Sequence, residues 1–310
     1  MKKLLVLLMA SVISVSIIAC SSPGEVSANE GQSINMEEES FSTESEISES
    51  ESEDVSEVMV EEGPKVLVKV SHCDSYETPR QTTEYEYDEV GNCIKAVTDY
   101  GCEEFTYDSS GKEISHTLYS NSGEKNQWDE STYDEDGRLI EKLYYSASTI
   151  SLGYYYDKYT YDEIGNVIRI DTLIVEEGVE SPGEYYIYEY DENGKIIKES
   201  LYGKYYAYNT IDQCIEYEYD ESGNQIKKLV YNNVYYANEM ALESTYEYKY
   251  DESGKLIEEK GSEFASDDYY VVYEYDEDGD LVKEIFYLDE EHTSFGGCIK
   301  YEYDNLIIEK

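Results

Sequence analysis

The stretch YYIYEYDENGKIIKESLY, Tyr185–Tyr202, decides the fold, because variants of it recur along most of the chain. Its Tyr-Asp pair occurs nine times, with the aspartates spaced 20 to 31 residues apart: Asp88, Asp108, Asp134, Asp162, Asp191, Asp220, Asp251, Asp276 and Asp304. In the first eight copies a glycine follows three residues after the aspartate, and an Ile or Val follows three residues after the glycine. The chain is therefore a tandem repeat of nine units.

Each unit has the pattern of one β-hairpin. Before the aspartate, aromatic and acidic residues alternate, as in Tyr188, Glu189 and Tyr190, which is typical of a half-buried strand with tyrosines on one face and carboxylates on the other. The Asp-x-x-Gly segment predicts a tight turn, since aspartate bonds its own backbone two residues on and glycine accepts a positive φ. The β-branched and aromatic residues that follow predict an antiparallel return strand.

The sequence also suggests a register for the hairpin. A four-residue loop from Asp191 to Gly194 would pair Tyr188 with Ile197 and keep both on the apolar face. A three-residue loop would instead place Ile197 opposite Glu189. We expect the four-residue loop.

Nine hairpins joined by short connections predict an all-β fold, in which tandem antiparallel β-hairpin repeats form a long curled meander sheet. We expect tyrosines on its concave side and charge on its convex side. The terminal units are atypical: the apolar run Val66–Val70 has no turn of its own and could cap the array, and the ninth unit lacks the glycine after Asp304.

Residues 1–20 have the pattern of a signal peptide, with two lysines followed by an apolar run. Their ending, Ile17-Ile18-Ala19-Cys20, resembles the lipobox of bacterial lipoproteins, which implies cleavage before Cys20 and a lipid anchor on it. The alternatives are a plain secretory signal and a single membrane span, for which the run is short. The resemblance implies an extracytoplasmic protein, lipid-anchored to the bacterial cell membrane.

Residues 21–64 are rich in serine and acidic residues, and such a segment buries too little apolar surface to fold. We interpret it as a disordered tether that lifts the repeats of residues 65–310 off the membrane; the alternative is acidic low-complexity sequence without a role. The formal net charge of −48 argues against nucleic acid as a partner, because phosphates need a basic surface.

The five remaining cysteines cannot all pair, and three of them share one position, six residues before the aspartate: Cys102, Cys214 and Cys298. We interpret them as small packing residues rather than as a disulfide framework. The chain has no Cys-x-x-Cys motif, so nothing indicates a zinc site.

The tandem Tyr-Asp-x-x-Gly hairpin, over about residues 82–310, resembles the YD repeat of the RHS family, bacterial surface and secreted proteins whose repeats wind a long β-sheet into a shell. Large members enclose a C-terminal toxin. This chain ends inside its last repeat and has too few units to enclose one, so the resemblance implies the sheet and the extracytoplasmic location without the toxin role.

The sequence indicates no catalysis, metal or cofactor. The three histidines, His72, His116 and His292, lie at unrelated positions in the unit, and carboxylates that recur nine times favour solvation over an active site. The segment Asp276–Asp280 faintly resembles a calcium loop, but its glycine is misplaced for an EF-hand and we expect a plain hairpin turn.

Tyrosine, with 37 residues, is the remaining signal, because its flat apolar ring and polar tip suit glycan stacking and protein contacts. Most tyrosines are expected in the core of the sheet, whereas runs of adjacent tyrosines must expose some. We therefore name Tyr155, Tyr186 and Tyr236 as candidate ligand-binding residues. Two functions remain: a lipid-anchored, non-catalytic surface protein that binds a glycan or protein, and a structural spacer or RHS-type shell fragment without a ligand.

Overall fold

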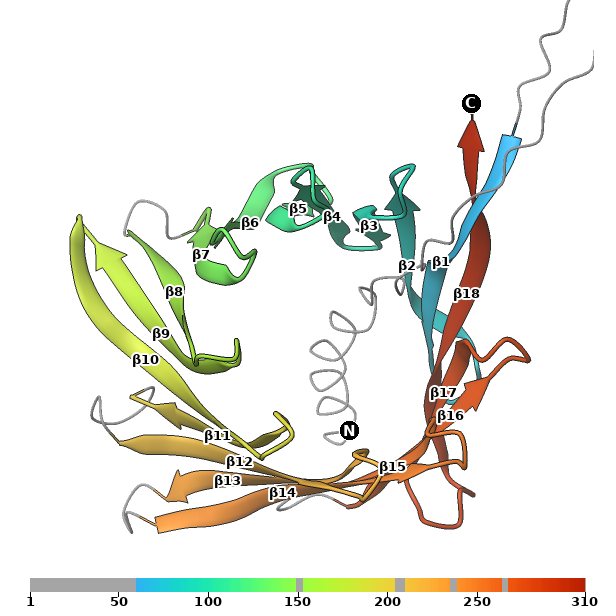
Figure 1. Cartoon of the computed structure of the whole chain (residues 1–310). Helices are drawn as coiled ribbons and strands as arrows, with labels where there is room; N and C mark the ends of the chain where they lie inside the picture. Colours follow the sequence, from blue (N-terminus) through green and yellow to red (C-terminus); the bar gives the residue numbers. More distant parts are fainter. Residues whose placement is uncertain (1–59, 149–152, 204–209, 235–238, 264–266, 310) are drawn as a thin grey trace, which may run out of the picture. The chain divides into compact units, whose positions relative to one another are not determined.

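The computed structural model describes residues 60–148, 153–203, 210–234, 239–263 and 267–309, which form antiparallel strands (Figure 1). Glu61–Ile308 make up one compact unit. The strands are β1 Val60–Cys73, β2 Pro79–Tyr87, β3 Cys93–Thr98, β4 Gly101–Tyr107, β5 Glu113–Ser120, β6 Lys125–Tyr133, β7 Leu139–Ser146, β8 Gly153–Tyr161, β9 Val167–Glu176, β10 Val179–Tyr190, β11 Ile196–Tyr202, β12 Ile211–Tyr219, β13 Gln225–Val234, β14 Glu239–Tyr250, β15 Leu256–Glu263, β16 Tyr269–Tyr275, β17 Leu281–Tyr287 and β18 Phe295–Glu309.

The Asp-x-x-Gly segments are the hairpin turns, as the sequence predicts. In the fifth unit the amide of Gly194 donates to the carbonyl of Asp191 at 3.1 Å, and the amide of Lys195 donates to the Asp191 side chain at 2.9 Å. Gly194 has a φ of +79°, which a side chain would strain. The amide of Lys195 holds the pKa of the Asp191 carboxyl below its usual range. The same bonds recur in all eight complete units, so the turn is part of the repeat.

The expected hairpin register was wrong. Tyr188 pairs with Glu199 rather than with Ile197. The loop has three residues, because Asp191 and Lys195 close it, and a bulge next to Tyr190 then leaves Ile197 without a partner. One extra residue in the return strand therefore shifts every later pair, and Ile197 is 38% exposed.

The alternation predicted for the outgoing strands is confirmed. Tyrosines three residues before the aspartate are half-buried, and burial raises their pKa: Tyr85, Tyr159, Tyr188, Tyr217, Tyr248, Tyr273 and Tyr301. The glutamates between them and the turn are exposed, as at Glu86, Glu189 and Glu302. We call the side of the sheet that carries these seven tyrosines the tyrosine face.

The sheet closes into a barrel, which corrects the long curled meander sheet expected from the sequence. Every strand pairs with the next along the chain, and β18 pairs with β1, so the eighteen strands close into a barrel. The reason lies in β1, whose Lys69 pairs with Glu84 of β2 just as Lys95 of β3 pairs with Glu104 of β4. The strand that contains Val66–Val70 thus takes the place of a return strand for the ninth unit, and in the part of the chain that the structure describes no sheet edge stays unpaired.

A repeated tyrosine hydroxyl bond joins each hairpin to the one before it. The hydroxyl of the Tyr in the Tyr-Asp pair donates to a backbone carbonyl at the start of the preceding return strand, at 2.5–3.0 Å. All nine do so: Tyr87 to Leu67, Tyr107 to Cys93, Tyr133 to Glu113, Tyr161 to Leu139, Tyr190 to Val167, Tyr219 to Ile196, Tyr250 to Gln225, Tyr275 to Leu256 and Tyr303 to Leu281.

Cations cover several of these same rings. Where the residue after the turn glycine is basic, its charged group lies over the tyrosine of the next Tyr-Asp pair: Lys112 over Tyr133, Arg138 over Tyr161, Lys195 over Tyr219 and Lys255 over Tyr275, at 4.9–5.4 Å. Each such tyrosine therefore combines a hydroxyl hydrogen bond with a cation–π contact to the preceding unit.

In the segments that the structure describes, no helix has the length and hydropathy needed to cross a lipid bilayer.

Removing one tyrosine hydroxyl should weaken the sheet measurably. Tyr190→Phe leaves the Val167 carbonyl without its 2.6 Å partner, and the free energy of unfolding should fall by about 1 kcal/mol. The melting temperature should fall by roughly 2–4 °C for a domain of this size. Urea unfolding measures the first and calorimetry the second. Tyr100→Phe, at a tyrosine that is 71% exposed, is the control and should leave both unchanged.

Candidate functional site

A band of polar side chains crosses β4 to β9 on the tyrosine face. Residues directly opposite each other on paired strands share a face. His116 lies opposite Asp129, Asp129 opposite Tyr144, and Tyr144 opposite Tyr155. Two residues from Tyr144 and Tyr155 along the same strands, Lys142 lies opposite Asp157, and Asp157 lies opposite Thr172. We call these residues, together with Glu103, the polar band.

The imidazole of His116 is held between two carboxylates. Its Nε2 lies 3.0 Å from Glu103 Oε2, and its Nδ1 lies 3.3 Å from Asp129 Oδ2. Burial alone would lower the pKa of His116, but the two carboxylates outweigh it and raise that pKa to about 9. The ring also stacks on Phe105, with 4.6 Å between centroids. At neutral pH this side chain is thus an imidazolium that donates from both nitrogens.

The two aspartates of the band differ in environment. Asp129 is 7% exposed, and its Oδ1 lies 2.9 Å from the Lys142 ammonium. Burial opposes ionisation, yet His116 and Lys142 hold the pKa of Asp129 below its usual value. Asp157 accepts a 2.6 Å hydrogen bond from the Thr172 hydroxyl, but burial dominates and raises its pKa. The band therefore contains one balanced set of ion pairs and one carboxyl that protonates more easily.

Two of the three candidate tyrosines lie on this face. Tyr155 is 47% exposed and stacks on Tyr144, with 4.8 Å between ring centroids. Tyr186 is half-buried in β10 and lies opposite Ile170, which is also opposite Tyr159 of the tyrosine face. Tyr236 and the proposed anchor Cys20 lie outside the described residues. The structure thus places Tyr155 at the end of the polar band and Tyr186 two strands away.

Sequence reasoning missed the polar band, although a signal was present. Five residues before the aspartate, the first four units have Thr83, Glu103, Asp129 and Asp157, and the last five have Tyr186, Ile215, Tyr246, Val271 and Ile299. The column changes from polar to apolar between the fourth and fifth units. Comparing the units position by position would have found Glu103, Asp129 and Asp157. His116 has no such signal, since its column is variable.

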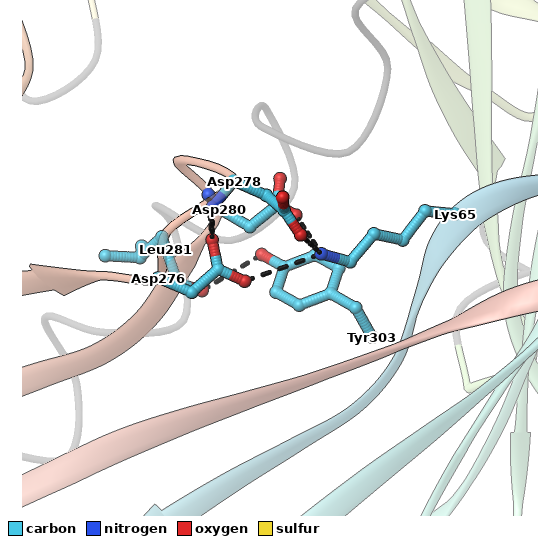
Figure 2. Close-up of polar contacts among 6 residues, drawn as sticks. All are labelled: Lys65, Asp276, Asp278, Asp280, Leu281 and Tyr303. Atoms are coloured by element: carbon cyan, nitrogen blue, oxygen red, sulfur yellow. Dashed lines mark hydrogen bonds and ion pairs between the residues drawn. The ribbon is translucent and has the colours of Figure 1, made fainter.

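The acidic turn Asp276–Asp280 is the hairpin turn expected, and its carboxylates surround an ammonium group (Figure 2). Asp276, Asp278 and Asp280 could together hold a cation. Lys65 of β1 places its Nζ 3.4, 3.2 and 2.6 Å from the three carboxylates and lies over the Tyr303 ring. These carboxylates, Asp280 first, raise the pKa of Lys65. The cluster therefore acts as an ion pair between the first strand and the eighth hairpin.

A second polar region of the tyrosine face lies on β12 to β15. A shallow hollow of about 370 Å³ is lined there by Lys228, Asn232, Glu243, Tyr246 and others. Lys228 lies opposite Tyr217, which places the hollow on the tyrosine face. Polar groups that alternate with aromatic rings across a sheet suit a ligand with many hydroxyls or a polar protein surface.

No protein-family model and no curated protein matches the chain. Among solved structures, it is similar to a chain of the Photorhabdus luminescens Tc holotoxin pore, with 16% identity over 73% of this chain and 14% of that chain, and a TM-score of 0.31. A TcdB2-TccC3 crystal structure gives 17% identity, 74% and 15% coverage, and a TM-score of 0.33. A porin-like protein from Bacteroides uniformis is 8% identical to this chain. The match covers 77% of this chain and 98% of that chain, with a TM-score of 0.41.

The His116 ion pairs should make stability depend on pH between about 6.5 and 9. The pKa of His116 is about 9 when folded and roughly 6.5 when unfolded. A raised pKa stabilises the fold fully below the unfolded value, and this stabilisation is lost as pH rises through about 9. Between pH 6 and 9.5 the free energy of unfolding should therefore fall by about 1–3 kcal/mol, measured by urea unfolding.

The matched variant for this measurement is His116→Gln, which keeps hydrogen-bonding capacity and cannot titrate. Its free energy of unfolding should show less dependence on pH over the same window. An imidazole of His116 that titrates near 6.5 by NMR in the folded protein would contradict the assignment.

Proposed function

We propose that this chain is a non-catalytic repeat protein that binds a glycan or a protein on the tyrosine face of its closed sheet. The observation that carries this proposal is the stacked pair Tyr144–Tyr155, with Tyr155 47% exposed, beside the polar groups Asp157 and Thr172. An exposed aromatic ring offers a flat apolar surface to a sugar ring, and neighbouring carboxylates and hydroxyls accept or donate hydrogen bonds to its hydroxyl groups.

The non-catalytic part of the proposal is supported by the contacts within the polar band. Among the described residues, both nitrogens of His116 are directed to carboxylates, and Lys142 is paired with Asp129. A catalytic base needs a free lone pair, and a nucleophile needs a base within hydrogen-bond reach. The band supplies fixed charges and hydrogen-bonding groups, which suit binding.

The proposed location is the outer side of a bacterial cell membrane, with lipid on Cys20. It rests on the resemblance of residues 17–20 to a lipobox and on the acidic segment 21–64. The proposed family is that of RHS or YD-repeat proteins, supported by the hairpin at each Tyr-Asp-x-x-Gly segment. A toxin is not part of the proposal.

Binding should depend on the two described candidate tyrosines. A glycan array and a pull-down with bacterial wall polymers, using the purified full-length chain, should give a ligand whose affinity falls about tenfold in Tyr155→Ala and in Tyr186→Ala, because each loses a stacking surface. Tyr100→Ala, at a 71% exposed tyrosine in the connection between β3 and β4, is the matched control and should bind as the unaltered protein does.

A structural spacer is the second candidate function. It is favoured by the nine tyrosines of the Tyr-Asp pairs, whose hydroxyls all bond to the neighbouring hairpin and so serve the sheet itself. No binding in either screen would favour the spacer. Binding that neither Tyr155→Ala nor Tyr186→Ala changes would contradict the proposed binding residues.

Lipid attachment should depend on Cys20 alone. In a bacterial host given a radiolabelled fatty acid, the chain should take up label and stay with the membrane fraction, and Cys20→Ser should remove the label because the thiol is the attachment atom. Cys102→Ser is the control and should keep both. Label that persists in Cys20→Ser would contradict the proposed anchor.

A further inference from the structure

The closure of the sheet brings two cysteines to one seam. Cys73 is the last residue of β1, and Cys298 lies in β18, the strand that pairs with β1. These cysteines are 225 positions apart in the chain, counted as 298 minus 73. β1 takes the place of a return strand for the ninth unit. The register of the other units therefore indicates which residues of β1 and β18 face each other.

In other units the residue six positions before the aspartate lies opposite the residue eleven positions after it. The pairs are Cys102 with Tyr119, Trp128 with Tyr145, Tyr185 with Tyr202, Cys214 with Tyr231 and Tyr270 with Tyr287. Several of them stack, including Tyr185 with Tyr202 at 4.7 Å between ring centroids. Side chains at these two positions are therefore in direct contact across the strands.

Cys298 and Cys73 occupy these two positions in the ninth unit. Cys298 stands six residues before Asp304. Cys73 follows a bulge in the β1–β2 pairing, and Tyr119, Tyr202, Tyr231 and Tyr287 follow the same bulge in theirs. The repeat thus sets Cys73 directly across from Cys298.

The local contacts agree with this placement. A Cβ built on Gly297 would lie 2.7 Å from the Cys73 carbonyl oxygen, so the two backbones pass close together beside Cys298. Burial raises the pKa of the Cys298 thiol to about 11, and the Cys73 thiol, hydrogen-bonded to it, contributes in the same direction. Cys298 is 1% exposed, and Cys73 is half-buried. Both are free thiols in this structure.

We propose that Cys73 and Cys298 form a disulfide bond that joins the first and last strands and closes the sheet covalently. Facing residues on antiparallel strands have Cα atoms roughly 4.5–5.5 Å apart, within the range of about 4.4–6.8 Å that a disulfide spans. Formation in the cell rests on the proposed extracytoplasmic location, where disulfides persist. The geometry of the pair does not depend on that location or on any ligand.

The reaction needs a disulfide as oxidant, such as oxidised glutathione or a thiol–disulfide oxidoreductase. The thiolate of Cys73, the more exposed residue, attacks one sulfur of the oxidant and releases the first thiol. The Cys298 thiol loses its proton and attacks the Cys73 sulfur, which releases the second thiol. Two protein thiols are oxidised and one external disulfide is reduced to two thiols. The ammonium groups of Lys283 and Lys300 stabilise the Cys298 thiolate.

The test is thiol mapping on the purified full-length chain, after incubation in oxidised and reduced glutathione. Free thiols are alkylated, the protein is digested without reduction, and linked peptides are identified by mass spectrometry. The expected result is a Cys73–Cys298 peptide and alkylated Cys93, Cys102 and Cys214. The oxidised protein should melt on the order of 10 °C above the reduced protein, since the bond closes a long loop.

Two variants keep the test decisive. Cys73→Ser changes the half-buried partner, and it should abolish both the linked peptide and the difference in melting temperature between oxidised and reduced protein. Cys214→Ser, whose residue faces Tyr231, should keep both. Alkylation of Cys73 and Cys298 in folded, oxidised protein, or a link from either one to another cysteine, would overturn the proposal. Loss of ligand binding without loss of the linked peptide would count against the proposed function alone.

Discussion

This structure depends on one repeated hydrogen bond. In each unit the tyrosine hydroxyl of the Tyr-Asp pair donates to a backbone carbonyl of the preceding return strand. In the described residues the sheet has no helix packed against it, so each hairpin is held mainly by its two neighbours. The backbone hydrogen bonds of strand pairing provide part of this stabilisation. The hydroxyl bond, made nine times at 2.5–3.0 Å, adds a side-chain contact that fixes one hairpin against the next near the turn. The aspartate that follows serves a separate purpose, since it bonds the turn within its own unit.

Closure follows from the same repeat. The carbonyl of Leu67 accepts a hydrogen bond from the hydroxyl of Tyr87, which gives β1 the contacts of a return strand. Lys65 then pairs with the acidic turn of the eighth hairpin, and Lys300 of β18 lies 3.0 Å from Glu77 in the β1–β2 connection. Lys69 also lies 3.8 Å from Glu302, and Lys283 lies 3.6 Å from Glu77, so several ion pairs lie across the seam in a strongly acidic chain. An unpaired edge on such a sheet would be a template for association, and pairing β1 with β18 removes it.

The sequence predicts the local structure well and the long-range structure poorly, for physical reasons. The turn at Asp191–Gly194 is encoded by residues in contact along the chain, and so is the alternation of Tyr188 with Glu189. The bulge at Ile197 is not, because nothing in Ile197 itself marks it as unpaired. Closure escaped prediction because β1 lacks the Tyr-Asp-x-x-Gly signature and is recognised only by its register. The polar band was missed because His116, Asp129 and Lys142 come from three strands, and only a comparison between units separates them from the repeat.

The units of this repeat protein differ at particular positions, and these differences separate the early units from the later ones. The residues shared by the first eight units, such as Tyr190 and Gly194, are accounted for by the turn and the sheet. Differences lie in positions that the sheet leaves unconstrained. Five residues before the aspartate, the later units have a tyrosine or an aliphatic side chain on the tyrosine face, whereas Asp129 and Asp157 in the earlier units need partners and are paired with His116, Lys142 and Thr172. Burying such charges opposes folding unless they are paired. The early units therefore depend on His116, Lys142 and Thr172 to keep Asp129 and Asp157 in the sheet, a requirement that Ile or Val at these positions would not impose.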